Sequence, residues 1–116
     1  MLKGSIYYVE ASLLEVIKND FIFLDQSSWF SLYREKDSGS YWRLDYLDKY
    51  QEQYFVRVDD LGNWRDFDAT DLKIELLKIT RGISTNSCLW GGCVKNALNQ
   101  LAFCEIHAFK EMGIRR

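Results

Sequence analysis

The three cysteines and the only histidine of this chain all lie between residues 88 and 107. Cys88 and Cys93 form a C-x4-C pair, Cys104 and His107 form a C-x2-H pair, and ten residues separate the two pairs. Zinc prefers four nitrogen or sulfur ligands in a tetrahedron, and two short loops that each supply a pair of ligands can build one with little backbone strain. The spacing therefore predicts one structural zinc site made of these four residues.

The local sequence favours the same site. Gly91 and Gly92 allow a tight turn in the first loop. Cys104 and His107 suit the opening turn of a helix that continues to Met112, because residues three apart share a helix face and a helix N-terminus favours thiolate. Residues 94–103 would form a tight hairpin or a turn of helix. The alternative is that the cysteines are small buried hydrophobic residues and the histidine is incidental, which leaves the shared spacing to chance.

Residues 88–107 resemble the small C-x4-C-x10-C-x2-H zinc knuckles found in bacterial and eukaryotic proteins. Gly92-Cys93, Ala97, Phe103-Cys104 and His107 match the positions of that pattern. The resemblance implies a structural zinc and no particular reaction.

Few residues remain for enzyme chemistry once the zinc ligands are assigned. With His107 bound to metal, no histidine is left for a Ser-His-Asp or Cys-His arrangement. The sequence has no GxGxxG, GxxxxGK[ST] or HExxH motif. The carboxylate pairs have simpler explanations, since Asp59 and Asp60 suit a turn and Asp68 suits a helix N-cap. We therefore expect a protein that is not an enzyme.

The first 82 residues predict an α+β body with a small antiparallel sheet of about four strands. Ser12-Leu13-Leu14-Glu15 has the pattern of a capping box for a short helix ending at Asn19-Asp20. The apolar run from Phe21 to Leu24 suits a buried strand. Aromatic and β-branched residues predict three further strands, at residues 29–34, 41–47 and 54–58, with Gly39 at positive φ in the turn between the first two.

A second helix is predicted over residues 68–80, with Leu72, Leu76 and Ile79 on one face. Arg81-Gly82 would end it, and residues 82–87 would be a polar connector. The zinc-binding module would follow at residues 88–116. With 116 residues and no proline, the chain predicts a single domain in which this module packs on the body formed by residues 1–82.

Charge is distributed unevenly along the chain. Residues 1–75 carry 15 acidic and nine basic side chains, a net charge of −6, whereas residues 76–116 carry two acidic and six basic side chains, a net charge of +4. No apolar stretch reaches the roughly 20 residues of a membrane-spanning helix, and the first residues lack the pattern of a signal peptide. We therefore expect a cytoplasmic protein that is not bound to a membrane.

Aromatic and acidic residues alternate through the middle of the chain, with nine carboxylates between residues 45 and 75. On one sheet face they would supply aromatic anchors for a protein partner and a field that attracts a basic one. The candidate partner-binding residues are Asp45, Tyr46, Asp48, Tyr50, Asp59, Asp60, Trp64 and Asp66.

The whole chain resembles a bacterial immunity protein of the contact-dependent growth inhibition or polymorphic toxin type. The resemblance lies in its size, its acidic aromatic body, and the segments Tyr41-Trp42-Arg43-Leu44-Asp45 and Asn63-Trp64-Arg65-Asp66-Phe67. It implies a cytoplasmic antitoxin that neutralises a cognate toxin domain, often a basic nuclease, by covering its active site or substrate surface.

Two other functions stay open at this point. The basic tail, with Trp90 able to stack on a base, suits a nucleic-acid-binding zinc-knuckle protein. Acidic residues of the sheet would suit a metal-dependent hydrolase.

Overall fold

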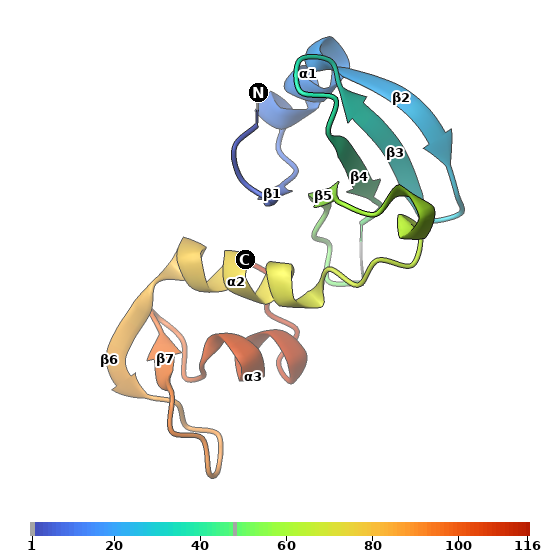
Figure 1. The fold of residues 1–116 in the computed structure, drawn as a ribbon. Helices are drawn as coiled ribbons and strands as arrows, with labels where there is room; N and C mark the ends of the chain where they lie inside the picture. The colour runs from blue at the N-terminus through green and yellow to red at the C-terminus, as the bar shows by residue number, and fades with distance from the viewer. Residues whose placement is uncertain (1, 48) are drawn as a thin grey trace. The chain divides into compact units, whose positions relative to one another are not determined.

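The computed structural model describes residues 2–47 and 49–116, and it has the predicted α+β architecture (Figure 1). The chain divides into two compact units, Met1–Ala69 and Thr70–Arg116. The boundary therefore lies before the second helix, upstream of the predicted division between residues 82 and 88. The elements of the first unit are β1 (Ile6–Tyr8), α1 (Ala11–Asp20), β2 (Phe21–Gln26), β3 (Phe30–Glu35), β4 (Tyr41–Asp45), β5 (Tyr54–Val58) and the 3₁₀ turn η1 (Leu61–Asn63).

The first unit is built on a five-stranded antiparallel sheet in the order β1-β5-β4-β3-β2. On one face, Ile17 of α1 packs with Phe21, Trp42 and Phe55. These side chains are at least 95% buried, and the Trp42 and Phe55 rings stack 5.1 Å apart. The other face is covered by the segment that follows β5. Its core is formed by Leu32, Val58 and Trp64.

The strand predictions at residues 29–34, 41–47 and 54–58 are confirmed as β3, β4 and β5, and Gly39 has the expected positive φ of 74°. The sequence prediction missed β1, which pairs with β5. It was also wrong about β2, which is an edge strand rather than a buried one (Figure 1). Only Phe21 of β2 is buried.

The start of α1 also differs from the prediction. The helix begins at Ala11 after Glu10, so Ser12 lies inside its first turn and no side chain caps it. The expected capping box is therefore wrong. Helix formation here depends instead on packing of Ile17 and its half-buried neighbours Leu13 and Val16 against the sheet.

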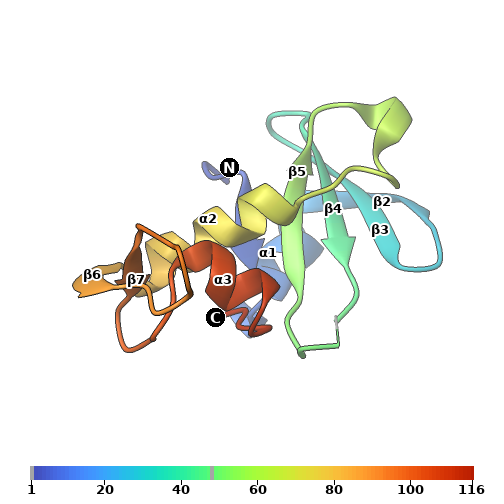
Figure 2. The same cartoon turned by 90° about the horizontal axis from the view of Figure 1, so that it is seen from below.

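The second unit contains α2 (Thr70–Arg81), a hairpin of β6 (Ile83–Ser87) and β7 (Asn96–Leu98), and α3 (Glu105–Lys110). Figures 1 and 2 both show α2 and α3 side by side, with the hairpin loop projecting beyond the strands. The two helices and β7 share one apolar core, whose buried members are Ile74, Leu77, Leu98, Ala108 and Phe109.

Three details of the second unit correct the sequence predictions. Residues 83–87 form a strand, not a connector. The buried face of α2 is made by Ile74 and Leu77, whereas Ile79 is 69% exposed. The helix starts at Thr70, two residues after the proposed N-cap Asp68. Its predicted end at Gly82 is confirmed by a φ of 78° and a hydrogen bond from the Gly82 N–H to the Lys78 carbonyl.

Candidate metal centre

Two structural elements of the second unit each supply one pair of the predicted metal ligands. Cys88 follows directly after β6, and Cys93 lies in the loop that leads to β7. Cys104 is the N-cap residue of α3, and His107 lies in the first turn of that helix. The β6–β7 hairpin and the start of α3 therefore meet at the site, as the two-pair spacing predicted.

The four side chains converge with the geometry of a metal site. The Cys93 and Cys104 Sγ atoms are 3.9 Å apart, and His107 Nδ1 lies 3.3 Å from Cys104 Sγ and 3.7 Å from Cys88 Sγ. All four ligand atoms lie within 4.8 Å of one another. A tetrahedral site with metal–sulfur bonds of about 2.3 Å separates its sulfurs by about 3.8 Å. Cys88, Cys93, Cys104 and His107 can thus hold one metal ion.

The pKa values of Cys88 and Cys104 shift in opposite directions, because burial and hydrogen bonds balance differently at the two sulfurs. Burial opposes ionisation of Cys88, but backbone hydrogen bonds from Cys104 and Trp90 outweigh it and lower the pKa of this thiol to about 6. Burial raises the pKa of Cys104, although backbone hydrogen bonds from His107 and Ile106 at the start of α3 oppose the rise. A bound cation would favour the thiolate form of each ligand.

An ion pair joins the two halves of the site. Lys95 Nζ, from the hairpin, lies 2.9 Å from Glu105 Oε1 in the first turn of α3. Glu105 is 5% exposed; burial opposes its charge, but the hydrogen bond and the positive charge of Lys95 lower the pKa of this carboxyl. The hydrogen bond and the negative charge of Glu105 in turn raise the pKa of Lys95.

Four protein ligands complete a tetrahedral coordination shell. A catalytic metal normally keeps one position open for water or substrate. The arrangement of three cysteines and one histidine therefore suits a structural metal site, in which a bound ion would link the hairpin to α3.

The predicted partner-binding residues do not form a single surface. Asp45 and Trp64 are about 95% buried, so their predicted role in partner contact is wrong. Asp45 accepts two hydrogen bonds from Arg43, which also donates to the Trp64 carbonyl. Both residues hold the segment after β5 against the sheet.

The exposed members of the predicted set lie at opposite ends of the sheet. Asp59 and Asp60 follow Val58, which pairs with Tyr41 at the start of β4, whereas Tyr46 follows the end of that strand. Tyr46 and Tyr50 are about 40% exposed. Asp66 is exposed in the segment after η1, and Asp48 lies outside the described residues.

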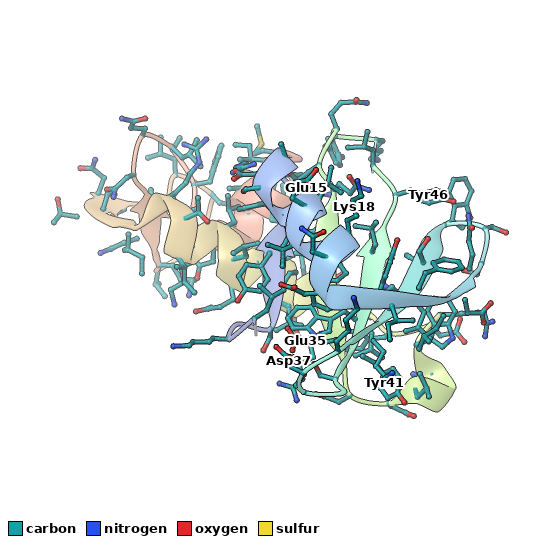
Figure 3. All side chains as sticks on the ribbon, turned by 90° about the horizontal axis from the view of Figure 1, so that it is seen from above. Glu15, Lys18, Glu35, Asp37, Tyr41 and Tyr46 are labelled. Atoms are coloured by element: carbon teal, nitrogen blue, oxygen red, sulfur yellow. The ribbon has the colours of Figure 1, made fainter. Side chains whose placement is uncertain are left out.

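The sequence prediction missed an exposed apolar surface around the β2–β3 hairpin, which we call the hairpin-end surface. The Tyr46 N–H donates to the Trp29 carbonyl, and Gln26 Nε2 donates to the Tyr46 hydroxyl, so the end of β4 lies beside the hairpin. Figure 3 shows Tyr46 at this end of the sheet, apart from Glu15 and Lys18 of α1. The members of the surface are Phe23, Leu24, Trp29, Tyr46 and Leu47, which are 40–68% exposed.

No helix in the described part of the chain is long and apolar enough to cross a membrane. Comparison with models of protein families, with curated protein sequences and with solved structures finds no match.

Proposed function

We propose that the metal bound by Cys88, Cys93, Cys104 and His107 is zinc. Three sulfur ligands and one imidazole in a closed tetrahedral set suit zinc better than magnesium or calcium, which prefer oxygen ligands. Elemental analysis of the purified protein should find about one zinc per chain. Cys104→Ser should lose the metal, whereas Ile79→Ser, a change at an exposed position of the same unit, should retain it. A folded native protein without zinc would contradict this assignment.

We propose further that the chain is a binding protein, and specifically a bacterial immunity protein that neutralises a cognate toxin domain in the cytoplasm. The observation that carries the proposal is the hairpin-end surface, because aromatic side chains exposed together are typical anchors of protein interfaces. Trp29, at 68% exposed, and Phe23, at 53%, contribute little to the core that α1 covers. Their exposed apolar area is better explained by a partner than by folding.

The charge of the first unit supports a basic partner. Residues 1–69 carry 13 acidic and eight basic side chains, a net charge of −5. An acidic protein is attracted to a toxin domain that binds nucleic acid, because such a domain presents positive charge to phosphates. Inhibition would follow if the bound immunity protein covered the substrate surface of a nuclease.

The proposal expects a toxin domain to be encoded beside this gene, and co-expression of the chain with that domain tests it. The chain should protect cells from that toxin, and Trp29→Asp should abolish protection while Ile79→Asp, at an equally exposed position of the second unit, should not. Circular dichroism would verify that both variants fold. Survival that does not depend on this gene would end the proposal.

A nucleic-acid-binding function is the second candidate, favoured by one observation in the second unit. Trp90 is 39% exposed beside the metal ligands, and residues 70–116 carry four acidic and seven basic side chains, a net charge of +3. Fluorescence anisotropy with single-stranded RNA and DNA would test it. Binding that weakens steeply with salt and is lost in Trp90→Ala would favour this candidate over the immunity function.

A further inference from the structure

Trp90 contacts three of the four metal-binding residues through three different groups. Its indole ring stacks on the His107 imidazole, with ring centroids 4.8 Å apart and an interplanar angle of 13°. Its carbonyl accepts a hydrogen bond of 3.0 Å from the Cys93 N–H. Its backbone also hydrogen-bonds the sulfur of Cys88.

Residues of the segment that precedes α3 hold the ring of Trp90 in place. Phe103, which precedes Cys104, meets the indole edge to face at 6.2 Å. The neighbouring Leu89 N–H donates to the Ala102 carbonyl at 2.9 Å, which ties the start of the hairpin loop to the segment before α3. The indole is therefore fixed between two elements that each carry a ligand pair.

The stack matters because the imidazole of His107 is only half-buried. Its Nδ1 faces the sulfurs of Cys88 and Cys104. A half-turn of the ring about its bond to Cβ would carry Nδ1 away from them. A parallel aromatic ring against one face resists that rotation and keeps water from that side of the imidazole.

We propose that Trp90 is a positioning residue of the metal centre, which holds the His107 ring with Nδ1 toward the metal and slows release of the ion. This inference rests on the proposed metal site and is independent of the immunity function. Trp90 does not coordinate the metal. It acts through His107 and through the turn that presents Cys88 and Cys93.

Metal release to a coloured chelator such as 4-(2-pyridylazo)resorcinol tests the inference on the full zinc-loaded chain. Trp90→Leu should release zinc about 10-fold or more faster than the native protein, in the range found when supporting residues of metal ligands are removed. Trp90→Phe retains a stacking ring and should release zinc at close to the native rate. Leu89→Ala changes an adjacent side chain that is 74% exposed, and it should leave the rate unchanged.

Cobalt substitution distinguishes positioning from a general loss of stability. The visible absorption bands of Co²⁺ report ligand geometry, so Trp90→Leu should alter them at a temperature where circular dichroism shows a fully folded protein. Equal release rates and identical cobalt spectra for native protein and Trp90→Leu would overturn the inference. A native protein that takes up neither zinc nor cobalt would instead refute the metal site itself.

A measurement on the native protein covers the case in which Trp90→Leu fails to fold. His107 is the only histidine of the chain, so its ring protons can be assigned without ambiguity in an NMR spectrum. A stacked indole should shift these protons upfield in the zinc-loaded protein. Ring protons at ordinary chemical shifts would contradict the stack and with it the inference.

Discussion

Arg43 lies at the centre of a buried polar cluster in the first unit. Its guanidinium binds both carboxylate oxygens of Asp45, at 2.7 and 3.2 Å, and donates to the carbonyls of Trp64 and Phe67. It also lies 4.1 Å from the centre of the Phe30 ring. Because Arg43 and Asp45 are two residues apart on one strand, their side chains share a sheet face. That face is covered by the segment after β5.

We expect Arg43→Ala to lower the free energy of unfolding by about 3–5 kcal/mol, because it removes the cation that pairs with the buried carboxylate of Asp45. Arg57→Ala is the control. Arg57 forms an exposed pair with Asp59 at 3.5 Å, and its loss should cost about 0–1 kcal/mol. Urea unfolding measures the loss in free energy of unfolding for each variant. Equal losses would show that the buried pair contributes no more than the exposed one.

Glu35 gives the first unit a specific sensitivity to acid. Its side chain is 2% exposed; burial opposes its charge, but hydrogen bonds from the Ser38 hydroxyl and the Leu2 N–H outweigh burial and lower its pKa below 4.5. Figure 3 shows Glu35 close to Asp37, where β3 enters its turn. A lowered pKa in the folded state means that the ionised carboxylate stabilises the fold.

This contribution is fully present above pH 4.5 and is lost as the pH falls from there through the lowered pKa of the folded state. Glu35→Gln should therefore be less stable than the native protein at pH 7, and the difference should shrink at acidic pH. Asp37→Asn, at a neighbouring exposed position, is the control. A difference between Glu35→Gln and native protein that is the same at pH 7 and pH 3 would contradict the prediction.

At the scale of elements, Gly82 fixes the end of α2. Its φ of 78° suits glycine, and a Cβ atom there would lie 2.8 Å from Asn99 Nδ2, which donates to the Arg81 carbonyl. We expect Gly82→Ala to cost about 1 kcal/mol or more of stability in urea unfolding. Gly91→Ala is the matched control, since its Cβ would meet no atom within 4 Å. Equal stability of the two variants would show that the helix end tolerates a side chain.

The elements also show which features could be predicted from sequence. The four metal-binding residues were predictable because one pair lies in a short loop and the other at the first turn of a helix, where spacing brings the two members of each pair together. The strand at residues 83–87 was not, because Ile-Ser-Thr-Asn-Ser shows no apolar alternation and its formation depends on pairing with β7. The burial of Asp45 could have been suspected from its spacing to Arg43. The exposure of β2 could not be predicted from the sequence, because an apolar run does not show whether a strand lies at the edge or in the middle of a sheet.

At the scale of the molecule, each unit has its own apolar core, and the one metal-binding group found among the described residues lies in the second unit. Chelation of zinc should therefore remove hydrogen-exchange protection from α3 and the β6–β7 hairpin while β3, β4 and β5 remain protected. Cys104→Ser should reproduce this pattern without chelator. A loss of protection across the first unit as well would show that the two units unfold as one cooperative structure.

Helix α2 belongs to the second unit, so a fragment that keeps the metal site must also keep this helix. A fragment that starts at Cys88 would contain every metal ligand but would lack Ile74 and Leu77, the α2 contribution to the core. The segment that keeps this core whole begins at Thr70. In genetic terms, a cassette transferred between proteins would have to carry the helix before the cysteines, because a junction placed at Gly82 would separate the metal site from Ile74 and Leu77.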